Sequence, residues 1–216
     1  MFSSIRGIGF DLDNTVYSED EYFREIIRLA GKVLKESDFY HQETFNKVRS
    51  SSTSDFFGDY LKEMGCYSFE RQEQLFRLYK TASIEVQVPE QNVDILLKLK
   101  DKYKTAVLTN GVIEAQKNKV RLLGVEELVH TVIFAREKGK EFEKPHFNAF
   151  QRLADGLGFA SEEILFIGDN PITDIEGARR FGMLTIWTSE WKSSKQENKV
   201  GADFQISLLN DLSFLI

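Results

Sequence analysis

The chain has 216 residues, a formal net charge of −6 and 42% hydrophobic residues. This composition is sufficient for one large domain with a core, or for a domain that carries an insertion. An acidic chain without a basic run is a poor binder of nucleic acid or of a membrane surface, so we expect neither partner.

The cysteine content and the N-terminal residues predict a cytoplasmic protein. Cys66 is the single cysteine, so an internal disulfide cannot form, which suits a reducing compartment. The first residues lack the charged segment and the long apolar segment of a secretory signal. No apolar stretch approaches the length of a membrane span.

The first predicted strand is the apolar run 5–10, which ends in Asp11 and Asp13. Parallel strands place working groups just past their carboxyl ends, so both carboxylates should lie at the mouth of a sheet. Two like charges this close are costly unless a cation joins them or one takes a proton, and Mg²⁺ suits such oxygen ligands. A polar turn is the alternative at this point. A calcium loop is excluded, because Val16 and Tyr22 replace its Gly and Glu.

Residues 18–85 are predicted to form a helical block. A capping-box pattern at 18–21 starts the first helix, and apolar residues then recur at helical spacing. Further helices are expected around 39–48, 56–64 and 75–82. No strand signal interrupts this block.

After Pro89 strands and helices alternate. The predicted strands are 105–108, 129–134, 164–167, 183–187 and 204–206, and the predicted helices are 91–101, a segment ending at Gly124, 145–157 and 173–181. Such alternation implies a parallel sheet with right-handed crossovers. The strands are apolar on both faces, as buried parallel strands are.

The predicted fold class is therefore α/β, with a doubly wound, Rossmann-like parallel-sheet core and an inserted α-helical domain. The connection from Thr15 to Lys104 is far longer than one crossover helix requires. We expect the core to comprise residues 1–17 and 86–216, and the insertion to comprise residues 18–85.

Three further stretches place polar side chains at the same edge of the sheet. Thr109 and Asn110 end one strand and could cradle an oxyanion. Lys144 precedes a helix and would add positive charge to an anion site. Asp169 and Asp174 follow another strand. Each stretch alone also fits an ordinary turn, a surface lysine or a carboxylate that stabilises a helix N-terminus.

Taken together and in this order, these stretches resemble the four motifs of the haloacid dehalogenase superfamily. The motif positions are 11–15, 109–110, Lys144 and 168–174, and the neighbouring Gln116 and Lys119 are similar to small-metabolite phosphatases of its first subfamily. The helical insertion resembles the type 1 cap of that subfamily.

The resemblance implies a phosphoric monoester hydrolase. Asp11 would be the nucleophile, and Asp13 would protonate the leaving oxygen and then activate water. Thr109 and Asn110 would hold phosphate oxygens. Lys144 would take part in catalysis and in phosphate binding by balancing the negative charge.

The resemblance also implies Mg²⁺ as the cofactor. Its ligands would be Asp11, the backbone carbonyl of Asp13, and Asp169, and Asp174 would help to place the metal or its waters. The implied substrate is a small phosphorylated metabolite, either a sugar phosphate or a nucleoside monophosphate. The reaction would pass through an aspartyl-phosphate on Asp11. We expect a monomer or a homodimer.

Two other functions stay open at this point. A phosphomutase of the same family would share all four motifs, and a non-catalytic phosphate-binding or regulatory protein could keep the fold. The family's dehalogenases lack the acid at the position of Asp13 and need no metal, so Asp13 and Asp169 favour phosphoryl transfer. The candidate specificity residues are aromatic, although we expect most of them to pack in the core of the cap: Tyr17, Phe23, Phe56, Phe57 and Tyr60.

Overall fold

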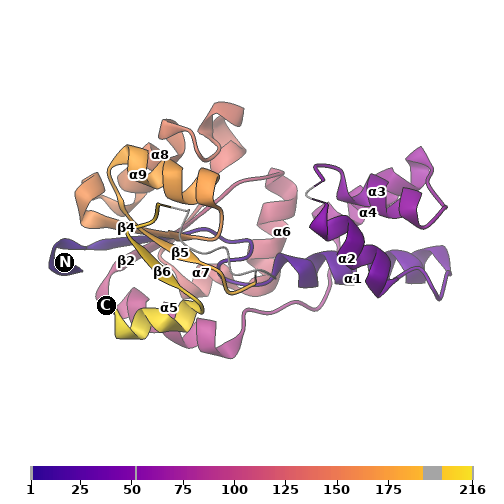
Figure 1. The fold of residues 1–216 in the computed structure, drawn as a ribbon, viewed down its shortest axis with the longest axis horizontal. Helices are drawn as coiled ribbons and strands as arrows, with labels where there is room; N and C mark the ends of the chain where they lie inside the picture. Colours follow the sequence, from indigo (N-terminus) through magenta and orange to yellow (C-terminus); the bar gives the residue numbers. More distant parts are fainter. Residues whose placement is uncertain (1, 52, 192–200, 216) are drawn as a thin grey trace. The chain divides into compact units, whose positions relative to one another are not determined.

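The structure is a computed structural model, and it describes residues 2–51, 53–191 and 201–215. Its internal contacts divide the chain into two compact units (Figure 1). The core unit comprises Met1–Ser18 and Gln87–Ile216, and the helical unit comprises Glu19–Val86. Within the described residues, no helix combines the length and the apolar character needed to cross a bilayer.

A six-stranded parallel sheet forms the centre of the core unit. Its strands are β1 (Gly7–Phe10), β2 (Lys104–Thr109), β3 (Thr131–Phe134), β4 (Ile164–Gly168), β5 (Leu184–Thr188) and β6 (Phe204–Ile206). Their order is β3-β2-β1-β4-β5-β6, and every neighbouring pair is parallel. The predicted α/β class with a doubly wound core and a helical insertion is confirmed.

The central strand β1 lies between β2 and β4, where the order of the strands reverses direction: β2 and β3 follow on one side of β1, and β4, β5 and β6 follow on the other. In such sheets ligands bind beyond the carboxyl ends of the strands at this switch point. All four residues of β1 are buried, so Asp11 is the first polar side chain to follow it.

Helices cover both sides of this sheet, with α8 and α9 on one side and α5 on the other (Figure 1). The helices of the core unit are α5 (Glu90–Lys102), α6 (Ile113–Leu123), α7 (Val125–Leu128), α8 (Phe147–Leu157) and α9 (Gly177–Phe181). Gly9 allows α8 to approach β1 closely, because a Cβ there would lie 2.6 Å from a methyl group of Leu153 in α8. Phe150 and Phe166 pack edge-to-face in the same apolar cluster.

Short helical turns complete the core unit. They are the 3₁₀ turns η1 (Phe2–Ser4), η2 (Ala135–Lys138), η3 (Lys140–Phe142), η4 (Ser161–Glu163) and η6 (Leu209–Phe214), and the π-helical turn η5 (Pro171–Glu176).

Two predicted helix starts in the core unit are wrong. The helix expected from Pro145 begins at Phe147. The helix expected from Thr173 begins earlier, at Pro171 in η5, because Asn170 accepts hydrogen bonds from the N–H groups of Ile172 and Thr173. An Asn cap followed by proline is a stronger helix start than the Thr173 capping box.

In the described part of the helical unit there are four helices: α1 (Glu19–Leu34), α2 (Gln42–Ser50), α3 (Phe56–Glu63) and α4 (Phe69–Thr81). The second helix was expected from Phe39 but begins at Gln42. The reason is Tyr60, whose hydroxyl donates to the Phe39 carbonyl at 2.7 Å and accepts from the His41 N–H at 2.9 Å. These bonds hold the segment before α2 outside the helix.

Aromatic side chains fill the interior of the helical unit. The ring of Phe23 contacts those of Phe56, Phe57 and Tyr79 at centroid distances of 4.6, 5.5 and 5.3 Å. Four of the five candidate specificity residues lie in this unit, and all four are buried. The fifth, Tyr17, is buried in the core unit.

Candidate active site

Polar side chains gather beyond the carboxyl ends of β1, β2 and β4, within the core unit. They line a pocket of about 200 Å³, and the lining residues are Asp11, Asp13, Asn14, Thr109, Asn110, Lys144, Asp169, Asn170, Thr173 and Asp174. Every site residue predicted from the sequence is in this lining. The structure therefore brings together four stretches that are far apart along the chain.

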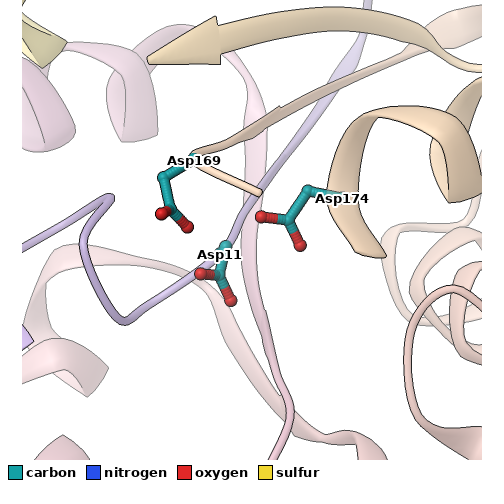
Figure 2. Close-up of side chains that lie close together, drawn as sticks. All are labelled: Asp11, Asp169 and Asp174. Atoms are coloured by element: carbon teal, nitrogen blue, oxygen red, sulfur yellow. The ribbon is translucent and has the colours of Figure 1, made fainter. Parts of the chain in front are cut away.

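Three carboxylates converge at one point of the pocket (Figure 2). Asp11, Asp169 and Asp174 each offer an oxygen, and the three oxygens lie within 4.8 Å of one another. Asp11 extends β1, since its N–H donates to the Ile167 carbonyl of β4 at 2.9 Å. Hard oxygen donors gathered in this way could hold a metal ion such as Mg²⁺, which prefers oxygen ligands.

The backbone around β4 sets the positions of the other two carboxylates. Trp187 of β5 is fully buried, and its indole N–H donates to the backbone carbonyl of Asp169 at 2.7 Å. The carboxylate of Asp174 accepts from the N–H of Asn170 at 2.9 Å. Gly168 leaves room for this arrangement, because a Cβ there would lie 2.5 Å from Asp174.

Lys144 is the cation of this cluster. Its Nζ lies 2.5 Å from Asp11 Oδ1 and 2.8 Å from Asp174 Oδ1, and its side chain is 2% exposed. Asn110 fixes the Lys144 backbone: its amide donates to the Lys144 carbonyl and accepts from the Lys144 N–H, both at 2.9 Å. Asn110, predicted as a phosphate ligand, thus also holds the lysine in place.

Burial and charge act in opposite directions on this cluster. Burial raises the pKa of Asp11 well above its ordinary value, Lys144 lowers it, and the negative charges of Asp174 and Asp169 raise it again. Burial alone would lower the pKa of Lys144, but the charges of Asp11 and Asp174 raise it instead. A cation bound beside Asp11 would keep this carboxylate ionised.

Asp13 lies in a different environment from the other three carboxylates. Its side chain pairs with Lys119 and accepts hydrogen bonds from Gln116 and Tyr17. Burial would raise the pKa of Asp13, but the charge of Lys119 and these hydrogen bonds bring it below its ordinary value. The Asp13 carboxyl is therefore ionised at neutral pH in this arrangement.

This environment bears on one expectation from the sequence. A cation was expected to join the carboxylates of Asp11 and Asp13, but Lys119 balances the charge of Asp13, whose carboxylate lies outside the three-carboxylate group. Lys119 belongs to α6, the helix that follows β2. The backbone carbonyl of Asp13 remains a predicted metal ligand.

Several residues that shape the site could not be assigned a role from the sequence. Gln116 and Lys119 were noted only for their similarity to the small-metabolite phosphatases of the family. Their spacing of three residues, which places them on one face of a helix, was the available signal. Nothing local to Trp187 indicates its bond to Asp169, because the two residues meet only once β4 and β5 pair.

Comparison with known proteins shows which family the chain resembles. A model of the haloacid dehalogenase-like hydrolases matches residues 8–188. The chain is 28% identical to the glyceraldehyde 3-phosphate phosphatase of Methanocaldococcus jannaschii, over 96% of this chain and 95% of that protein. It is 23% identical to the N-acylneuraminate-9-phosphatase of Rattus norvegicus, over 87% of this chain and 84% of that protein.

Solved structures share the fold. A magnesium-bound HAD-hydrolase from Bacillus subtilis superposes with a TM-score of 0.78 at 19% identity, over 98% of both chains. The family predicted from the four motifs is confirmed, since the family model spans most of the sequence. The chain belongs to the haloacid dehalogenase-like hydrolase family.

Proposed function

We propose that the chain hydrolyses a small phosphorylated metabolite in a Mg²⁺-dependent reaction, through a phosphoryl group held transiently on Asp11. The predicted enzyme class, phosphoric monoester hydrolase, is confirmed by the family and by the phosphatases among its relatives. One observation carries the finer proposal: the buried Asp11 carboxylate points into a small polar pocket beside Lys144 and two further carboxylates.

The charges of the pocket support a divalent cation. Asp11, Asp13, Asp169 and Asp174 all line it, and in the described part of the chain two buried lysines, Lys119 and Lys144, contact these carboxylates. Four carboxylates exceed two ammonium groups by two charges, which a dication would balance. Asp11, Asp169 and the Asp13 carbonyl would hold Mg²⁺, with Asp174 in support. When bound, the ion would neutralise phosphate charge in the transition state.

In the first step, an oxygen of Asp11 attacks phosphorus while the bond from phosphorus to the leaving oxygen breaks. The electron pair of that bond goes to the leaving oxygen, and the Asp13 carboxyl supplies its proton, so an alcohol departs. The negative charge of the incoming phosphate favours the protonated form of Asp13 that this step needs. Lys144 balances the charge on Asp11 and on the phosphoryl group.

In the second step, the Asp13 carboxylate takes a proton from water, and the water oxygen attacks phosphorus. The bond between phosphorus and Asp11 breaks, and its electron pair restores the Asp11 carboxylate. Inorganic phosphate leaves, and Asp13 has regained its proton. Thr109, at the pocket wall, would hold phosphate oxygens through both steps, together with Asn110, whose side-chain amide makes one donor bond within the described residues and has a second N–H to offer.

The substrate class follows from the relatives and from the size of the pocket. Relatives aligned over nearly the whole chain are phosphatases of glyceraldehyde 3-phosphate. A pocket of about 200 Å³ accommodates a phosphate with a small part of its alcohol. We therefore propose a sugar phosphate or a nucleoside monophosphate, with triose phosphates as the first to test. We propose that the helical unit acts as a cap that selects among them.

A substrate panel tests this proposal. The purified chain is assayed for phosphate release from p-nitrophenyl phosphate, glyceraldehyde 3-phosphate, hexose phosphates and nucleoside monophosphates, with Mg²⁺ and with EDTA. We expect Mg²⁺-dependent release, with kcat/KM highest for one metabolite class. Asp11→Asn is the inactive control, and Asp101→Asn, at an exposed position of α5, should stay active.

Three results would contradict the proposal. No phosphate release from any member of the panel would point to a non-catalytic binder. Isomerisation of a sugar phosphate without release of inorganic phosphate would point to a mutase. Equal activity in EDTA and in Mg²⁺ would remove the metal from the mechanism.

A further inference from the structure

Three side chains hold the carboxylate of Asp13. The hydroxyl of Tyr17 and the Nζ of Lys119 both donate to Asp13 Oδ1, each at 2.7 Å. The amide Nε2 of Gln116 donates to the other oxygen, Oδ2, at 2.9 Å. All of these residues belong to the core unit.

The three donors are buried, whereas Asp13 reaches the pocket. Tyr17 and Lys119 are 0% exposed and Gln116 is 3% exposed, but the Asp13 side chain is 19% exposed and lines the pocket. A buried ammonium group is costly unless it is paired, so breaking the Lys119–Asp13 contact would leave a buried charge without its partner. Buried side chains therefore hold the Asp13 carboxylate, and its exposed part faces the pocket where the substrate would bind.

The two oxygens of Asp13 are not equivalent. A carboxylate oxygen has about two lone-pair sites. Oδ1 accepts two hydrogen bonds, from Tyr17 and Lys119, and is filled. Within the described residues Oδ2 accepts one bond, from Gln116, so one of its lone pairs remains available.

From this asymmetry we infer that Oδ2 is the atom of Asp13 that gives and takes the proton, and that Tyr17, Gln116 and Lys119 are positioning residues for it. This inference rests on the proposed phosphatase function. In the first step the O–H bond on Oδ2 breaks and its proton goes to the leaving oxygen. In the second step Oδ2 takes a proton from the attacking water.

The three donors are needed because a carboxylate rotates easily. The terminal torsion of an Asp side chain is broad, with no sharp staggered wells. Two donors on Oδ1 and one on Oδ2 remove this freedom before the substrate arrives. Proton transfer requires the two heavy atoms at hydrogen-bond distance, so fixing the carboxylate favours the reactive geometry in both steps.

Tyr17→Phe is the cleanest test, because it removes one hydroxyl from a buried ring. We expect kcat to fall about tenfold for Tyr17→Phe and about a hundredfold for Lys119→Met, with KM unchanged within about twofold. The matched controls are Tyr103→Phe, near the opposite end of β2, and Lys117→Met, an exposed neighbour on α6. Both controls should keep wild-type kcat. Melting temperatures identify any variant that misfolds.

The pattern across substrates distinguishes positioning from general damage. p-Nitrophenolate leaves with little protonation, so in Tyr17→Phe its release should stay fast while attack of water slows. A burst of nitrophenol should then precede slow turnover. An alkyl phosphate needs the proton in the first step, so it should show slow turnover without a burst. Equal slowing of both substrates without a burst would contradict the inference.

A double variant gives the decisive result. If Tyr17 acts through Asp13, adding Tyr17→Phe to Asp13→Asn should lower kcat by less than about twofold further, because the group it positions is already absent. Losses that multiply would overturn the inference, as would a Tyr17→Phe enzyme as active as Tyr103→Phe. A wild-type chain without phosphatase activity would instead refute the proposed function, so the two failures are distinguishable.

Discussion

The backbone of Gly168 faces the side chain of Asp174 so closely that a Cβ on Gly168 would lie 2.5 Å from the Cβ and from a carboxylate oxygen of Asp174. The missing side chain at the end of β4 therefore lets Asp174 turn back toward Lys144 and Asp11. This contact makes a glycine part of the predicted metal site, although it offers no ligand.

Gly168→Ala should accordingly weaken Mg²⁺ binding without unfolding the chain. The added methyl group displaces Asp174, which costs about 1–3 kcal/mol of stability by overpacking. We expect the Mg²⁺ concentration for half-maximal activity to rise about tenfold or more, as when residues that orient metal ligands are lost. The control is Gly156→Ala in α8, where the nearest atom to a new Cβ is a flexible methyl of Ile133 at 3.2 Å. An unchanged Mg²⁺ requirement in Gly168→Ala would contradict this account of the glycine.

Metal exchange is a second test. Removal of divalent ions with EDTA should abolish turnover, and added Mg²⁺ should restore it, because the pocket holds more carboxylates than lysines. Ca²⁺ should bind and inhibit, since it prefers more ligands and a looser geometry than Mg²⁺. The measurement is a titration of activity with each ion after chelation. Full activity in a demonstrably metal-free sample would refute the metal assignment.

Tyr60 should matter for stability and not for the choice of substrate. Tyr60→Phe leaves the buried Phe39 carbonyl and the part-buried His41 N–H without their partner, at a cost of about 1–3 kcal/mol in the free energy of unfolding. Tyr60→Ala should cost about 3–5 kcal/mol. Tyr67→Phe, at an exposed hydroxyl, is the control and should stay within about 0.5 kcal/mol of wild type. Denaturant unfolding and the substrate panel measure the two effects, and a changed substrate ranking with unchanged stability would contradict the prediction.

Local patterns in the sequence were sufficient to predict the parallel sheet and the edge at which the candidate site residues gather. Apolar runs such as Ile164–Ile167 end in polar residues, and in a parallel sheet those ends meet at one edge. Asp11 and Asp169 could therefore be placed near each other before any contact was known.

Features that depend on distant contacts could not be predicted in this way. The orientation of Asp13 depends on Lys119, which is 106 residues away along the chain. The start of α2 depends on Tyr60, whose bonds to Phe39 and His41 compete with helix formation. In both cases the partner residue comes from another element of the fold. Hydrophobic periodicity and helix-capping patterns describe one element at a time, so they give no signal for such a contact.

Asp13→Asn separates the two chemical steps. The amide can neither donate the proton of the first step nor accept that of the second, but the backbone carbonyl proposed to bind Mg²⁺ is kept. With p-nitrophenyl phosphate we expect a burst of nitrophenol and then slow turnover, with kcat reduced roughly 10²–10⁴-fold. The Mg²⁺ concentration for half-maximal burst should match that of wild type. A loss of Mg²⁺ binding together with activity would mean that the Asp13 side chain is itself a ligand.

Trapping the phosphoryl group tests the central claim most directly. Asp13→Asn is mixed with p-nitrophenyl phosphate and Mg²⁺, quenched in acid and reduced with borohydride, which converts an acyl phosphate on aspartate to homoserine. Peptide mass spectrometry should then find homoserine at position 11 and at no other aspartate, and Asp11→Asn should lose kcat by about 10³-fold or more. An unmodified Asp11 under conditions that give the nitrophenol burst, or an Asp11→Asn enzyme within about tenfold of wild type, would contradict the account.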